Sequence, residues 1–69
     1  MVYIYIVIDR NDLAFNYYVD ENAVDINGRK LTVEQHVEDI FNMERYVEKV
    51  KVYLYFNDRM RHKQTFERQ

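Results

Sequence analysis

Two segments that alternate between aliphatic residues and tyrosine constrain the fold of this chain more than any other feature. Residues 2–8 read VYIYIVI and residues 50–56 read VKVYLYF. Alternation with period two in β-branched and aromatic residues predicts strands whose successive side chains face opposite sides of a sheet. We expect the aliphatic side of each strand to face the core and the tyrosine side to face outward. In the first strand, the expected inward residues are Val2, Ile4, Ile6 and Ile8, and the expected outward residues are Tyr3, Tyr5 and Val7. In the second segment, the expected inward residues are Val50, Val52, Leu54 and Phe56, and the expected outward residues are Lys51, Tyr53 and Tyr55.

Turn-forming residues divide the first half of the chain into short pieces. DRND at residues 9–12 separates the first strand from LAFNYYV at 13–19, which predicts a hairpin. Asn27-Gly28 is a strong turn signal and predicts a short third strand at 23–26. The residues of 13–19 that we expect to face the core are Leu13, Phe15, Tyr17 and Val19.

The segment after Thr32 predicts a helix. Thr32 is a typical N-cap and Gln35 stands at the reciprocal position of a capping box. The apolar stripe comprises Val33, Val37, Ile40, Phe41 and Val47. Glu44 interrupts this stripe. Either the helix bends or ends near Asn42, or Glu44 is a partly buried carboxylate with a hydrogen-bonding partner in a helix that runs to about Glu48, with Glu44 near the edge of the stripe. We expect the longer helix.

These elements predict an α+β fold, a two-layer sandwich of order ββ(β)αβ. One helix would pack on one face of a small mixed or antiparallel sheet, and the opposite face would be rich in tyrosine. A right-handed crossover would place the last strand beside the first and parallel to it. We expect one compact domain at residues 1–57. Residues 58–69 are polar and basic, and we expect a short helix or a frayed tail there.

Sixty-nine residues can build only a small core, and no cysteine is present to reinforce it with a disulfide. A partner chain is the remaining common source of stability. Residues 1–8 are apolar but lack a preceding basic segment and are too short to span a bilayer. We therefore expect a cytoplasmic protein with no membrane association.

The residue types needed for most enzyme chemistry are scarce. The chain has no serine or cysteine, and its one glycine, Gly28, cannot form a phosphate-binding loop. His36 and His62 lack the spacing of a pair of metal ligands. We expect no catalytic residue, no metal site and no cofactor. Asp9, at the end of the first strand, would be the centre of a small metal-dependent nuclease, but the interpretation that we prefer is a role in the adjacent turn, with its side chain bonded to local backbone N–H groups.

Two binding functions remain. A sheet that displays tyrosines can stack the bases of single-stranded nucleic acid, with cations on the phosphates. The candidate cations are Lys51, Arg59, Arg61, Lys63 and Arg68. Residues 1–50 hold ten acids and five bases, whereas residues 51–69 hold two acids and five bases, so most of the chain is a poor polyanion binder.

The interpretation that we prefer is a small protein-binding module without catalytic activity. Tyrosine is enriched at protein interfaces because it buries a large, rigid area and keeps a polar group. The partner would be another protein that this chain modulates or inhibits, as small phage or mobile-element proteins do, or a second copy in a homodimer. The candidate partner-binding residues are Tyr3, Tyr5, Val7, Tyr18, Tyr53 and Tyr55.

Overall fold

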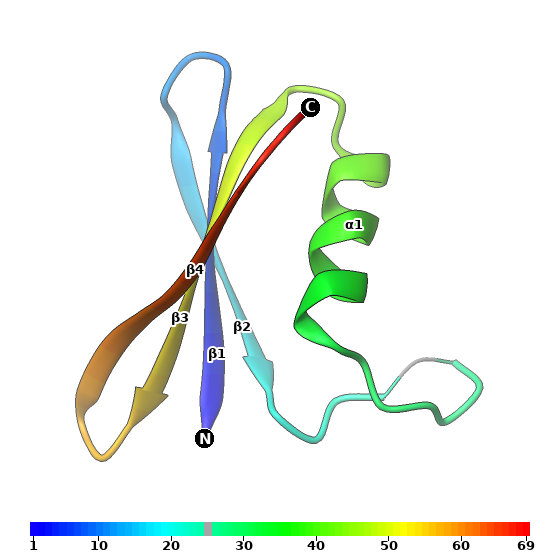
Figure 1. Cartoon of the computed structure of the whole chain (residues 1–69), viewed down its shortest axis with the longest axis vertical. Helices are drawn as coiled ribbons and strands as arrows, with labels where there is room; N and C mark the ends of the chain where they lie inside the picture. The colour runs from blue at the N-terminus through cyan, green and yellow to red at the C-terminus, as the bar shows by residue number, and fades with distance from the viewer. Residues whose placement is uncertain (25) are drawn as a thin grey trace.

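The computed structural model describes residues 1–24 and 26–69 and forms one small α+β domain (Figure 1). A four-stranded antiparallel sheet has the order β2-β1-β3-β4, and one helix lies between β2 and β3 in the chain. This confirms the predicted fold class. The elements are β1 Val2–Asp9, β2 Ala14–Asp20, α1 Val33–Met43, β3 Val47–Phe56 and β4 Arg59–Glu67.

Strand β3, which follows the helix, runs antiparallel to β1, whereas we expected the strand after the helix to run parallel to it. The predicted strand at 23–26 includes Asp25, which lies outside the described residues. Beside it, Val24 makes only an isolated bridge with Lys30. Helix α1 runs alongside β1 in the same direction, and β3 returns antiparallel beside β1 (Figure 1).

Residues 59–67 form β4, an edge strand paired with β3, where we expected a short helix or a tail. Asn57 and Asp58 form the two-residue turn between them, with φ of 50° and 60°, as hairpins with a primed turn require. Strand β4 has no apolar alternation because an edge strand has little contact with the core. Its Phe66 is the residue that packs against the buried cluster.

The two faces of β1 are assigned opposite to our expectation. Tyr5 and Val7 belong to the buried cluster under the helix, and Tyr3 packs against it. The pairing register explains the assignment, because Tyr5 lies opposite Val52 and Val7 opposite Val50. Residues directly opposite in a sheet share a face, so the inward valines of β3 bring the tyrosines of β1 inward with them.

The other inward predictions are partly confirmed. In β3, Val50 and Val52 are fully buried, whereas Leu54 is half-buried and Phe56 is exposed. In β2, Val19 packs against the core. The remaining predicted core residues of that segment, Leu13, Phe15 and Tyr17, are exposed because the single helix does not cover them.

Helix α1 begins as predicted and ends earlier. The Thr32 hydroxyl accepts a hydrogen bond from the Gln35 amide at 3.1 Å, which caps the N-terminus. Val33, Val37 and Ile40 are buried against the sheet. Glu44 is the exposed C-cap, so it is not a buried carboxylate, and the prediction of a helix to about Glu48 is wrong.

A residue from the far end of the chain closes this helix. The Arg68 guanidinium donates to the carbonyls of Phe41 at 2.9 Å, Glu44 at 2.8 Å and Val47 at 2.7 Å. Carbonyls at a helix C-terminus lack partners within the helix, and a positive charge there also suits the helix dipole. Val47, which we had placed in the helical stripe, is a buried residue of β3.

The face assignment predicts unequal effects for two Tyr→Ser substitutions. Tyr5 is 2% exposed and Tyr46 is 68% exposed. Tyr5→Ser should lower the free energy of unfolding by about 3–5 kcal/mol, the cost of deleting a buried aromatic side chain. Tyr46→Ser should lower it by less than about 1 kcal/mol. Urea denaturation followed by circular dichroism measures both, and equal losses would contradict the assignment.

Candidate functional site

The sheet face opposite α1 is covered by no other element among the described residues, and we call it the open face. Partners in the register share a face, so its members can be followed from strand to strand. It consists of Val2, Ile4, Ile6 and Ile8 from β1, Ala14, Asn16, Tyr18 and Asp20 from β2, Lys49, Lys51, Tyr53 and Tyr55 from β3, and Met60, His62, Thr65 and Glu67 from β4.

The centre of the open face is packed by its own side chains. Ile4 is only 7% exposed although no helix lies over it. Its neighbours across the strands, one on each side, are Tyr18 and Tyr53. Beside it lies an apolar hollow of about 460 Å³, lined by Val2, Ile4, Tyr18, Tyr55 and Met60.

Polar contacts orient the aromatic side chains of β3. The Tyr55 hydroxyl donates to the carboxylate of Asp58 at 3.0 Å. The Tyr53 ring makes an edge contact with the His62 ring at 5.3 Å between centroids. His62 Nε2 in turn lies 2.8 Å from the Thr65 hydroxyl. These contacts restrain the rings of Tyr53 and Tyr55.

The six predicted partner-binding residues do not share one face. Tyr18, Tyr53 and Tyr55 lie on the open face, as predicted. Tyr5 and Val7 are buried under the helix, and burial raises the pKa of the Tyr5 hydroxyl to about 12. The prediction that Tyr3, Tyr5 and Val7 face outward is therefore wrong.

Sequence reasoning missed the aliphatic half of the open face. The residues that replace Tyr3, Tyr5 and Val7 there are Val2, Ile4, Ile6 and Ile8. The alternation did group these residues together, but nothing in it distinguishes the covered side of a strand from the uncovered side when both are apolar. Met60 was missed because β4 was not recognised as a strand.

The predicted cations have separate roles in the structure. Arg68 caps the helix, as described above, and also lies over the Phe41 ring at 5.0 Å. Lys63 lies over the Tyr3 ring at 5.5 Å, on the side of the sheet that carries the helix. Arg59 and Arg61 line a cavity on that same side, whereas Lys51 lies on the open face. The five cations thus form no single surface with the tyrosines.

The candidate metal ligands have structural roles. The Asp9 carboxylate accepts hydrogen bonds from the amides of Asn11 at 2.8 Å and Leu13 at 3.0 Å, which is the turn role considered above. No group of three or more histidine, aspartate or glutamate side chains within residues 1–24 and 26–69 could hold a metal ion.

His36 lies at the boundary of the core. Its ring stacks on Tyr5 with 4.7 Å between centroids and 15° between planes. Burial lowers the pKa of the His36 imidazole, and the nearby Asp39 carboxylate opposes this effect. The neutral form of His36 is therefore the one that the fold stabilises.

No helix in the described part of the chain is long and apolar enough to cross a membrane. The chain matches no protein-family model, and no curated protein or solved structure matches it. The open face is thus interpreted from its own geometry.

The lowered pKa of His36 predicts a pH dependence of stability. As the pH falls through the unfolded value of about 6.5, the unfolded chain takes up a proton before the folded chain does, so the free energy of unfolding decreases. His36→Phe keeps a ring against Tyr5 and should flatten this decrease between pH 7.5 and 5.5. Urea denaturation at both pH values measures the change in the free energy of unfolding. His62→Gln is the control and should retain the decrease, and an unchanged slope in His36→Phe would contradict the assignment.

Proposed function

We propose that this protein acts in the cytoplasm, without catalysis, by binding a protein through the open face. The observation that carries the proposal is a sheet face with an apolar centre that no part of the described chain covers. Tyr18 is 67%, Met60 53% and Tyr55 39% exposed on this face. Apolar patches of a few hundred Å² on a small domain usually mark an interaction site.

A second copy of the chain is the partner that this face fits best. Four strands about 4.8 Å apart and about 26 Å long present roughly 500 Å². Two copies would therefore bury about 1,000 Å² in total, which reaches the lower limit for a specific interface. The protein would then be a homodimer in which two sheets pack face to face about 10 Å apart.

The charges on the open face suit such a contact. Lys49 and Glu67 lie at one end of the face and neutralise each other at 3.6 Å. Lys51 can place its aliphatic stem on the apolar surface and its ammonium group at the rim. An apolar centre with a polar rim is the usual arrangement of a protein interface. A larger protein that is modulated or inhibited by this chain would use the same centre.

The other two hypotheses have weaker support on this face. Nucleic acid would need phosphate-neutralising cations beside the tyrosines, and of the five predicted cations the one on the open face is Lys51. A nuclease would need a free carboxylate at Asp9, and that carboxylate already accepts two backbone hydrogen bonds.

Substitutions on the open face test the proposal. The triple variant Tyr18→Ser, Tyr55→Ser, Met60→Ser removes exposed apolar area while leaving the buried cluster intact. Light scattering should give the wild-type protein about twice the mass of the 8.6 kDa chain and the variant the mass of one chain. The expected cause is the loss of apolar burial between the two copies.

A matched triple variant controls for lost surface hydrophobicity. Ile26, Met43 and Tyr46 are 99%, 79% and 68% exposed and lie outside the sheet. Their simultaneous change to serine should leave the mass at two chains. A single-chain mass for the wild-type protein at millimolar concentration, or a two-chain mass for the open-face variant, would contradict the homodimer.

A further inference from the structure

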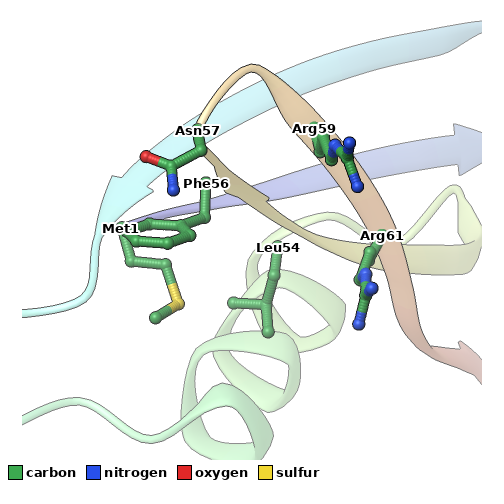
Figure 2. A pocket seen from close by; sticks show the side chains of 6 residues that line it. All are labelled: Met1, Leu54, Phe56, Asn57, Arg59 and Arg61. Carbon is green, nitrogen blue, oxygen red and sulfur yellow. The ribbon is translucent and has the colours of Figure 1, made fainter.

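A second surface hollow lies on the opposite side of the sheet from the open face. It has a volume of about 530 Å³ and is lined by Met1, Leu54, Phe56, Asn57, Arg59 and Arg61. Figure 2 shows these side chains gathered around the turn that joins β3 to β4, beside the start of β1. The volume is within the range of about 300–1,000 Å³ that is typical of small-molecule sites.

Cross-strand pairing builds this hollow. Arg59 lies opposite Phe56 and Arg61 opposite Leu54, so two arginines and two apolar side chains share one face at the end of the hairpin. Figure 2 shows Leu54 and Arg61 extending to the same side of the hairpin. The turn between β3 and β4 sets this register. It consists of two residues, Asn57 and Asp58, and both have positive φ.

The charge of the hollow is positive and unbalanced. None of the six lining residues carries a carboxylate side chain. Within residues 1–24 and 26–69, the ion pairs are those of the N-terminal ammonium with Glu21, Arg10 with Glu48, and Lys49 with Glu67. Arg59 and Arg61 thus have no acidic partner among these ion pairs.

Two of the three apolar residues of the hollow are exposed, as are both arginines. Phe56 is 57% and Met1 48% exposed, beside the half-buried Leu54. Basic residues on an edge strand can prevent strand-to-strand aggregation. That role does not need an apolar wall beside the cations.

We propose that this hollow binds a nucleotide, with the phosphate on Arg59 and Arg61 and the base on Phe56. Planar guanidinium groups bind phosphate oxygens through paired hydrogen bonds. An exposed aromatic ring offers a stacking surface to any base. The same nucleotide chemistry occurs in free mononucleotides and in single-stranded nucleic acid.

The test is a calorimetric titration of the intact protein with adenosine monophosphate. The nucleotide should bind at least about tenfold more tightly than either adenosine or inorganic phosphate alone, because it engages both halves of the hollow. Arg59→Gln and Arg61→Gln should each weaken binding about tenfold. Phe56→Ser should weaken the binding of the nucleotide and leave that of inorganic phosphate unchanged.

Arg45→Gln is the matched control, since it removes the same charge from an exposed residue in the connection between α1 and β3. It should leave the affinity within about twofold of the wild-type value. Competition by a ten-nucleotide single strand would assign the site to nucleic acid, and no competition would assign it to the free nucleotide. Undetectable binding of adenosine monophosphate, or an equal loss in Arg45→Gln, would overturn the proposal.

Discussion

A single helix has to cover a four-stranded sheet, and the rest of the structure depends on this mismatch. A helix is about 10 Å wide, whereas four strands span about 19 Å. Helix α1 buries Val33, Val37 and Ile40 against the middle of one face and leaves the rest of that face uncovered. The opposite face is not covered at all by the described chain. On the open face Tyr18, Tyr55 and Met60 are therefore exposed, whereas Val2, Ile6 and Ile8 are half-buried and Ile4 is buried.

Strand β4 stabilises the fold although it contributes little to the core. Its pairing with β3 makes β3 an interior strand, and Phe66 packs against the buried cluster. Arg68, the residue after the end of β4, closes the C-terminus of the helix by donating to three backbone carbonyls. The basic residues near the end of the chain thus serve different purposes. Arg68 is structural, whereas Arg59 and Arg61 are free to bind a ligand.

Local patterns predicted the elements more reliably than their relation to one another. The period-two alternation identified β1 and β3, and the Thr32 cap marked the start of the helix. Two errors came from long-range pairing. The choice of the covered face depends on the register that places Tyr5 opposite Val52, and the helix end depends on Arg68, which lies 24 residues after Glu44. Neither is visible in a local window, since both faces of β1 are apolar and Val47 fits a helical stripe as well as a strand.

The dependence on long-range pairing also explains which residues of the candidate sites were predicted and which were missed. Tyr18, Tyr53 and Tyr55 were identified because tyrosine is conspicuous on a strand, whereas the isoleucines beside them resembled core residues. The cavity at Arg59 and Arg61 depends on the pairing of two strands, and a polar edge strand such as β4 lacks the alternation that predicts one.

The most direct test of the open face as a self-association surface uses the methionine methyl groups. Met60 lies on the open face and is 53% exposed, whereas Met43 is 79% exposed near the end of α1. Methyl nuclear magnetic resonance of the labelled protein can follow both signals on dilution from about 1 mM to about 1 µM. We expect the Met60 signal to shift with concentration while the Met43 signal stays constant. A constant Met60 signal, or an equal shift of Met43, would contradict the central claim.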